Sequence, residues 1–237
     1  MCWLVKSAMP DKNAWPVEES LFFTGNGYLG VRACFEEPFR SGDDRVTIRG
    51  TYINAFHEIT DVEYGEKLYG FPETQQKLAN VADAQTVILT FGTGAGEEPE
   101  TFAMDDGEVL GYERRLHMDR GIAERIVHWR SPGGKEVKLV FRRLVSFRRR
   151  ELFLQEIEIE PVNFRGRATV KAVLNGDVQN YVNRKDPRVG AKHAKLLNVT
   201  ASRAEGDGVV GIELAAPRSG LRTACASALR IGRDAEW

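Results

Sequence analysis

The stretch that decides the fold spans Ile122 to Phe147 and reads IAERIVHWR-SPGG-KEVKLVFRRLVSF. Two segments that suit extended chain flank residues 131–134, whose proline and paired glycines are typical of a tight turn. The pattern predicts a β-hairpin with strands over residues 122–130 and 135–147. The dense basic run of residues 142–150 alternates with apolar residues, and we expect its arginines to be solvated at a strand end and turn.

Further short strands are expected on both sides of this hairpin. Residues 85–91 carry apolar side chains at every second position, and residues 152–160 alternate apolar residues with glutamates before Pro161. A break in that alternation between Leu154 and Ile157 predicts a β-bulge. No segment shows helical apolar spacing over three turns, so residues 74–84 are only the best candidate for a short helix. Additional strands are expected over residues 109–118, 168–174, 195–203, 209–215 and 221–231.

Many short strands separated by turn residues predict a mainly β protein, a sandwich or barrel, with at most one or two short helices. A length of 237 residues suits a single domain of this kind. No apolar run approaches the roughly 18 residues of a membrane-spanning helix, so we expect no membrane partner. The start of the chain shows no secretory signal, and three scattered cysteines are too few for a disulfide framework. These features predict a cytoplasmic protein.

Charge is balanced over the whole chain but not within its halves. Residues 1–120 carry 11 Lys and Arg against 21 Asp and Glu, a net charge of −10, whereas residues 121–237 carry 22 against 13, a net charge of +9. Such asymmetry can indicate a basic nucleic-acid face joined to an acidic tail. The acidic half is patterned and rich in aromatic residues, unlike a tail. We therefore expect two halves that neutralise each other, and no nucleic-acid partner.

Residues 25–30, GNGYLG, match the G-x-G-x-x-G pattern of dinucleotide-binding folds. In those folds a helix follows the glycines, but residues 31–38, VRACFEEP, form an extended pattern that ends at a proline. The motif is therefore interpreted as a tight loop, whose glycines allow positive φ or close approach by another segment. Asn26 and Tyr28 lie in this loop and are candidates for hydrogen bonding or stacking.

Polar residues elsewhere form no convincing catalytic or metal-binding pattern. His57 precedes Glu58, but adjacent residues of a strand point to opposite faces. His117 and His128 lack the spacing of metal ligands, so we expect no metal site. The Glu36–Glu37 pair could be read as paired carboxylates, yet glycoside cleavage needs two carboxyl groups about 5–10 Å apart across a sugar. These patterns by themselves identify no catalytic residue.

Several segments carry a more specific pattern: residues 19–32 (ESLFFTGNGYLGVR) with the following Glu36–Glu37, residues 50–58 (GTYINAFHE), residues 116–122 (LHMDRGI) and residues 143–146 (RLVS). Together, in order and at plausible spacing, they resemble glycoside hydrolase family 65, which includes maltose, trehalose and kojibiose phosphorylases and some hydrolases. His117 stands where aspartate is usual in that family, and Ala33 and Ala55 replace expected glycines. The resemblance covers nearly the whole chain.

The resemblance implies a large antiparallel β-sandwich of the galactose-mutarotase-like type, forming the N-terminal domain of a longer enzyme. In the family this domain precedes linker helices and an (α/α)₆ barrel. The barrel holds a general-acid glutamate, and phosphate or water attacks an α-glucosidic disaccharide with inversion. None of the barrel is recognised within residues 1–237, so we expect this single domain to be inactive alone. Its expected partners are its own barrel and a second copy in a homodimer. Inorganic phosphate as a co-substrate is the only small-molecule requirement that the resemblance implies.

The glycine loop and the segment around residues 52–57 contain more glycine, asparagine and aromatic residues than an independent sandwich needs. We expect these segments to face the barrel or the mouth of its pocket, although core and turn roles remain an alternative. Two other functions also remain open: a stand-alone carbohydrate-binding module with stacking aromatics, or a mutarotase-like epimerase, which needs a His/Glu acid–base pair in one cleft. The candidate facing residues are Asn26, Tyr28, Arg32, Tyr52, Asn54 and His57.

Overall fold

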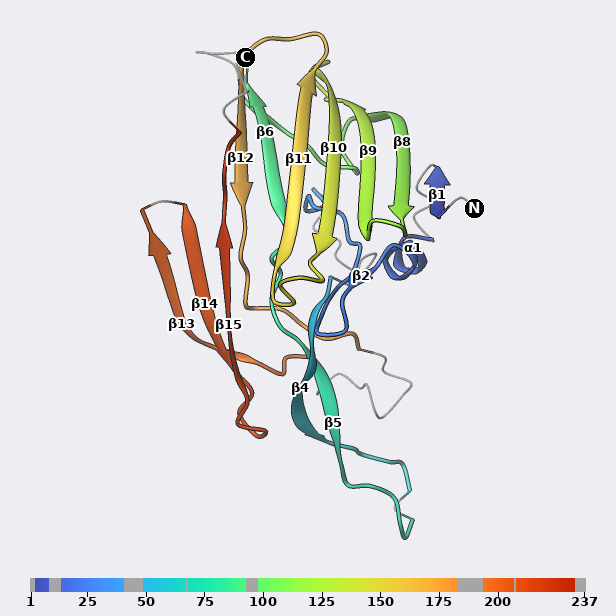
Figure 1. The fold of residues 1–237 in the computed structure, drawn as a ribbon, viewed down its shortest axis with the longest axis vertical. Helices are drawn as coiled ribbons and strands as arrows, with labels where there is room; N and C mark the ends of the chain where they lie inside the picture. The colour runs from blue at the N-terminus through green and yellow to red at the C-terminus, as the bar shows by residue number, and fades with distance from the viewer. Residues whose placement is uncertain are drawn as a thin grey trace. The chain divides into compact units, whose positions relative to one another are not determined.

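The computed structural model describes residues 3–8, 14–40, 49–66, 68–92, 98–182, 194–206 and 208–232. Within these ranges the chain is mainly antiparallel β, with fifteen strands and one short helix (Figure 1). The chain divides into two compact units. Unit 1 comprises residues 1–49, 85–173 and 231–237, and unit 2 comprises residues 50–84 and 174–230. Both units are therefore assembled from segments distant in the sequence.

Unit 1 contains two antiparallel sheets. The larger has five strands, in the order β1 (Leu4–Ala8), β8 (Glu108–His117), β9 (Ile122–Arg130), β10 (Glu136–Val145) and β11 (Phe153–Pro161). The smaller has three, in the order β12 (Arg167–Ala172), β6 (Val87–Gly92) and β7 (Glu100–Thr101). Alternate residues of β9 and β10 are buried, so each strand turns one face towards the core.

A single hydrophobic core joins side chains from both sheets of unit 1, as in a β-sandwich. Leu89 and Phe91 of β6 pack in it with Trp129 of β9 and Phe141 of β10, and each is at most 1% exposed. Phe102 meets Trp129 edge to face, with ring centroids 5.3 Å apart. The Trp129 Nε1 atom donates to the backbone oxygen of Asp106 at 2.7 Å, so the buried indole is satisfied.

The one described helix, α1 (Trp15–Leu21), precedes the short strands β2 (Thr24–Gly25) and β3 (Leu29–Val31). Pro16 in its first turn suits a helix start. Trp15 anchors the helix by stacking on Phe39, with ring centroids 5.1 Å apart. The prediction of a helix over residues 74–84 is wrong, because Thr74–Asn80 forms strand β5. The helix at Trp15–Leu21 has seven residues, too few to show apolar spacing over three turns.

Unit 2 has its own sheet and its own core. Strand β4 (Thr51–Asp61) pairs antiparallel with β5, and β13 (Asn198–Glu205), β14 (Val209–Ala215) and β15 (Arg222–Ala228) form a three-stranded sheet. The pairing of β4 with β5 shifts register between Tyr52 and His57. Ala55, within this irregular stretch, has φ +63°, a left-handed conformation that strains any residue with a Cβ atom. The second core includes Phe56, Val81, Leu196, Leu197 and Leu214.

The predicted hairpin at residues 131–134 is confirmed. Ser131 donates its backbone N–H to Lys135 O at 2.8 Å, and Gly134 donates to Ser131 O at 2.9 Å. The predicted bulge in β11 is wrong, because β11 pairs with β10 in continuous register from Pro161 to Phe153. Leu154 breaks the apolar alternation because it is an outward-facing leucine, 47% exposed. Among the described residues, no helix is long and apolar enough to span a membrane.

Candidate functional site

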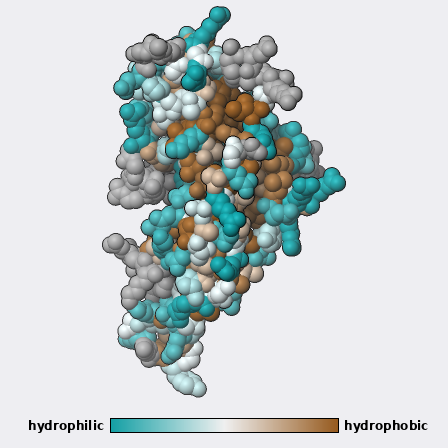
Figure 2. All heavy atoms as spheres, turned by 90° about the vertical axis from the view of Figure 1, so that its left-hand side faces the viewer, coloured by the Kyte–Doolittle hydropathy of each residue, from teal (hydrophilic) through white to brown (hydrophobic). Residues whose placement is uncertain are grey.

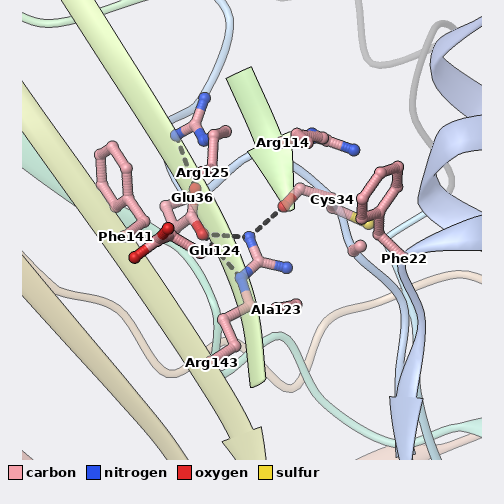
Figure 3. Close-up of a pocket in the computed structure, with 10 residues that line it drawn as sticks. Phe22, Cys34, Glu36, Arg114, Ala123, Glu124, Arg125, Phe141 and Arg143 are labelled. Carbon is pink, nitrogen blue, oxygen red and sulfur yellow. Dashed lines mark hydrogen bonds and ion pairs between the residues drawn. The ribbon is translucent and has the colours of Figure 1, made fainter. Parts of the chain in front are cut away.

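A buried ion-pair network connects residues 32–37 with strands β9 and β10 of unit 1 (Figure 3). Glu36 and Glu37 are each 1% exposed. Arg125 of β9 binds both carboxylates, with its Nη2 atom 2.5 Å from Glu36 Oε2 and its Nη1 atom 2.9 Å from Glu37 Oε1. Arg143 of β10 donates from Nε to Glu36 Oε1 at 2.6 Å. Glu36 thus lies between two guanidinium groups.

Arg143 also holds neutral acceptors around the same site. Its Nη1 atom donates to Gln85 Oε1 at 2.9 Å, and its Nη2 atom donates to the backbone oxygen of Cys34. The expectation that the arginines of the basic run are all solvated is therefore wrong for Arg143, which is 6% exposed. Its side chain occupies a core-facing position of β10, in line with Leu139 and Phe141.

The sequence patterns did not lead to the prediction that Arg125 and Arg143 share one buried site, although the positions of the two arginines in their strands indicate it. Each arginine stands at a position where the period-two pattern of its strand requires an inward side chain. A charged residue at such a position needs a buried partner of opposite sign. The adjacent glutamates at 36 and 37 supply that partner, and they join the acidic first half of the chain to its basic second half, as the charge distribution predicts.

The electrostatics of the network favour the ionised form of every member whose pKa is shifted. Burial alone would raise the pKa of Glu36, but the charges of Arg125 and Arg143 outweigh it and hold that pKa below its ordinary value. Burial would likewise lower the pKa of Arg125, yet Glu36 and Glu37 raise it. The Arg125 guanidinium also lies 4.3 Å from the centroid of the Phe141 ring, a cation–π contact.

The network has the properties of a structural site. The cavity beside it is about 20 Å³ and is lined by Cys34, Glu36, Arg125 and Arg143 among others. That volume admits one water molecule and no sugar ring. A general acid needs a raised pKa, whereas the pKa of Glu36 is lowered. The network can therefore fix the segment before β6 against the sandwich, but it cannot protonate a glycosidic oxygen.

The glycine loop is the turn of the β2–β3 hairpin, and Asn26 organises it. The Asn26 Oδ1 atom accepts from the backbone N–H groups of Tyr28 at 2.9 Å and Leu29 at 2.8 Å. Its Nδ2 atom donates to the backbone oxygens of Ser146 at 2.6 Å and Arg150 at 2.9 Å. All four bonds go to backbone, so Asn26 ties this hairpin to the segment that follows β10.

The glycines of this loop act as the sequence predicts. Gly27 has φ +87°. Gly25 and Gly30 make room for the Phe23 ring, because a Cβ atom would lie 2.8 Å from it at position 25 and 2.5 Å at position 30. The tight-loop interpretation is confirmed. Tyr28, half-buried, has the Arg150 guanidinium 4.6 Å from its ring centroid.

The remaining candidate of unit 1, Arg32, is half-buried beside helix α1. Its Nη2 atom donates to the backbone oxygen of Pro16 at 3.1 Å and lies 3.4 Å from Glu19 Oε2. The side chain therefore secures the residues after β3 to the helix. Asn26, Tyr28 and Arg32 all belong to unit 1 and to the short elements around its first hairpin.

The other three candidates lie on β4 of unit 2. Tyr52 is half-buried at the start of the irregular stretch, and Asn54 is exposed within it. The His57 Nδ1 atom lies 2.8 Å from the backbone oxygen of Ala55, the residue with positive φ. The strain at Ala55 thus lies between two of the predicted residues.

His57 and Glu58 point to different surroundings, as the strand pattern predicts. His57 is half-buried, whereas Glu58 is 3% exposed. The Glu58 carboxylate accepts from the backbone N–H groups of Arg218 at 3.0 Å and Ser219 at 2.8 Å. It holds the turn between β14 and β15, so the two residues do not form an acid–base pair.

Two further histidines, His117 and His128, lie at charged positions of the sheet. His117 Nδ1 lies 2.8 Å from Arg120 Nη2, and His128 Nε2 lies 3.3 Å from Glu136 Oε2. Across the described ranges, no group of three or more His, Cys, Asp or Glu residues could hold a metal ion.

Comparison with known proteins finds phosphorylases that are similar to this chain in sequence. The chain is 58% identical over 99% of its length to an alpha,alpha-trehalose phosphorylase of Geobacillus stearothermophilus and 36% identical over 86% of its length to one of Thermoanaerobacter brockii. It is 31% identical over 75% of its length to a kojibiose phosphorylase of Halothermothrix orenii. The chain spans only 30%, 26% and 20% of these relatives, respectively.

A solved protein from the human microbiome, named as a proposed kojibiose phosphorylase, has the same fold. It superimposes with a TM-score of 0.71 at 18% identity, over 91% of this chain and 26% of its own. The sequence model described as "Glycosyl hydrolase family 65, N-terminal domain" matches residues 8–236. That match covers nearly the whole chain, so the chain belongs to glycosyl hydrolase family 65 and corresponds to the N-terminal domain of that family.

Proposed function

We propose that this chain is the non-catalytic N-terminal domain of a longer enzyme that cleaves α,α-trehalose with inorganic phosphate. The observation that carries the proposal is the 58% identity, over 99% of the chain, to the trehalose phosphorylase of Geobacillus stearothermophilus. The kojibiose phosphorylase relative is much more distant, at 31% identity. Residues 1–237 act as a single domain in this proposal, which the family match over residues 8–236, drawn from both units, supports.

The surroundings of the buried carboxylates and the small cavity support assigning catalysis to the part of the enzyme outside this chain. The buried carboxylates of Glu36 and Glu37 are held by arginines, and Glu58 is held by backbone N–H groups. The cavity of about 20 Å³ beside the ion-pair network excludes a disaccharide. Inorganic phosphate enters as a co-substrate of the whole enzyme, and no other cofactor is proposed.

The six candidate residues are proposed to face the catalytic part of the same enzyme, a helical barrel, or the mouth of its pocket. Asn26 supports this role for its loop because four backbone hydrogen bonds fix the loop and leave Tyr28 half-buried beside Arg150. A rigid aromatic side chain loses little conformational entropy on contact with a partner or a sugar. Carbohydrate contact by this domain is proposed only within the whole enzyme.

The cellular setting is proposed from the thiols. The chain has three scattered cysteines, too few for a disulfide framework, which supports the reducing cytoplasm that the sequence predicts. A homodimer of the whole enzyme is the assembly proposed, with sedimentation of the full-length protein as its measurement.

The substrate test uses the full-length enzyme with inorganic phosphate and, separately, trehalose, kojibiose and maltose. We expect glucose 1-phosphate to form fastest from trehalose. Equal or faster phosphorolysis of kojibiose or maltose would overturn the substrate assignment, and release of free glucose alone would indicate hydrolysis.

The facing role is tested by replacing Tyr28 with alanine in the full-length enzyme, with Tyr181→Ala as the control. Tyr181 is an exposed tyrosine of unit 2 outside the predicted set. We expect Tyr28→Ala to change kcat/KM for trehalose and Tyr181→Ala to leave it unaltered. Unchanged kinetics together with unchanged stability in Tyr28→Ala would rule out the facing role.

A further inference from the structure

The loop between β4 and β5 carries a group of apolar side chains, most of them exposed. We call this cluster the aromatic tip and define it as Tyr64, Leu68, Tyr69 and Phe71. Leu68 is 56% exposed, Phe71 is 45% exposed and Tyr69 is fully exposed. Hydrophobic residues also reach the surface elsewhere (Figure 2), but single exposed apolar residues are ordinary, whereas a local group of them often marks an interaction site.

The aromatic tip has a defined backbone. Val62 donates its N–H to Glu73 O at 2.9 Å and closes the base of the loop. Phe71 donates to Leu68 O at 3.2 Å, and Gly70 between them has φ +87°, as the third residue of a type II turn requires. The rings of Tyr64 and Phe71 pack with centroids 4.8 Å apart. Tyr69 is thus presented at the second position of a turn that its neighbours hold.

The core of unit 2 does not explain this arrangement. The residues of that core come from β4, the end of β5 and the region of β13–β15, and none belongs to the aromatic tip. Tyr69 is fully exposed on a held turn, so it gains no burial from the part of the chain that the structure describes. Large aromatic residues with few rotatable bonds are, however, the side chains that most often anchor protein interfaces.

We propose that the aromatic tip docks onto the part of the longer enzyme that lies outside residues 1–237, with Tyr69 as the anchor. This proposal rests on the proposed function, in which the chain is one domain of a longer polypeptide. The partner surface would lie in the remaining part of such an enzyme, since the chain spans only 30% of the Geobacillus stearothermophilus trehalose phosphorylase.

Charge defines the chemistry of the partner surface. Residues 62–73 contain three glutamates and one lysine, so the loop has a net charge of −2. The surface that receives it should be an apolar pocket with lysine or arginine at its rim. Contact between the tips of two copies would bring like charges together, which disfavours a second copy as the occupant.

A photo-cross-linking experiment on the full-length enzyme tests the contact. p-Benzoylphenylalanine replaces Tyr69 in one variant and Tyr181, another exposed tyrosine of unit 2, in the control. After irradiation, peptide mapping should show the residue at position 69 joined to a peptide from outside residues 1–237 of the same polypeptide. Cross-links only within residues 1–237, only to a second copy, only to bound sugar, or none above the control would overturn the proposal.

A second measurement distinguishes docking from a role in folding. Tyr69→Ser in the full-length enzyme should raise the rate of proteolytic separation of this domain by about tenfold, the effect of losing roughly 1.4 kcal/mol of contact. Tyr69→Phe should keep the wild-type rate. In the 237-residue chain alone, Tyr69→Ser should leave the urea midpoint unchanged. A wild-type separation rate in Tyr69→Ser would contradict docking, and a lowered midpoint in the isolated chain would assign Tyr69 to folding.

The trehalose assay on the same enzyme separates the two proposals. If position 69 cross-links as expected but no glucose 1-phosphate forms from trehalose, the docking contact stands and the substrate assignment fails. If trehalose is phosphorolysed and the cross-link is absent, the function stands and the docking contact fails.

Discussion

Replacing Arg143 with methionine tests whether the buried ion-pair network stabilises unit 1. Methionine keeps an unbranched apolar stem but has no hydrogen-bond donor. The change removes the ion pair with Glu36 and the hydrogen bonds to Gln85 Oε1 and Cys34 O. Among the described residues, Arg125 would remain as the guanidinium paired with the two buried carboxylates of Glu36 and Glu37.

The magnitude follows from burial. Breaking a buried pair by removing one partner costs about 3–5 kcal/mol, because the remaining charge stays in a poorly solvating interior. Arg125 still compensates part of the charge of Glu36, which favours the lower end, about 3 kcal/mol. This is a large fraction of the roughly 5–15 kcal/mol that stabilises a typical domain.

The adjacent Arg142→Met variant is the matched control. Arg142 lies on the same strand with its side chain on the other face, 31% exposed, and it pairs with Glu124, Glu156 and Glu158. Exposed ion pairs contribute at most about 1 kcal/mol each and are screened by salt. The two variants therefore remove the same charge from the same strand and differ in its burial.

Urea unfolding followed by tryptophan fluorescence and circular dichroism measures both variants. Trp15 and Trp129 are buried in the core of unit 1 and report its unfolding. We expect Arg143→Met to lose about 3 kcal/mol and Arg142→Met to lose less, about 1–2 kcal/mol, because its three pairs are partly exposed and share one guanidinium. Free energies of unfolding that agree within about 0.5 kcal/mol would refute the claim that burial makes Arg143 essential.

Three further predictions concern single sites. The folded pKa of Glu36 lies below its ordinary value of 4.5, so the unfolded chain binds more protons than the folded chain, and the resulting stability is present above about pH 4.5 and is lost as pH falls through the folded pKa. Over this window the urea midpoint of Glu36→Gln should fall less than that of wild type. Equal slopes of midpoint against pH would contradict this prediction. Ala55→Gly should stabilise the chain by about 0.5–1 kcal/mol because it relieves the strain of φ +63°, whereas Ala224→Gly in strand β15 should destabilise it. Thermal unfolding measures both variants, and a loss of stability in Ala55→Gly would show that Ala55 is unstrained. Gly107→Ala should destabilise the chain more than Gly134→Ala. Both glycines have positive φ, but only at position 107 would the new Cβ atom lie 2.4 Å from a backbone oxygen. Equal urea midpoints of the two variants would contradict this clash.

Local patterns in the sequence were enough to predict the strands around residues 122–147, because alternation and a proline–glycine turn act over a few residues. They misassigned residues 74–84, whose glutamine, lysine and alanine content suits a helix, because pairing with β4 decides the structure there. The buried network escaped prediction for a different reason. Glu36 and Arg143 are 107 residues apart, and only the assembled sandwich shows that both are inside.

The functional candidates were predicted from composition and resemblance, and the structure adds what holds several of them. Asn26 is a turn organiser whose bonds all go to backbone, which a loop sequence cannot reveal without its partners at Ser146 and Arg150. The proposed docking of Tyr69 rests on its exposure on a held turn, which the sequence does not reveal, since an isolated tyrosine predicts neither burial nor contact.

The interleaving of the two units has a consequence for synthesis of the chain on the ribosome. Unit 1 includes residues 85–173 and again residues 231–237, and unit 2 extends to residue 230, so neither can finish folding early. At about 5–20 residues per second, Glu36 waits about 5–20 s for Arg143, its partner 107 residues later, to be synthesised. Because an unpaired carboxylate is costly to bury, we expect burial of the neighbouring Phe35 to be delayed until the cationic strands have been synthesised.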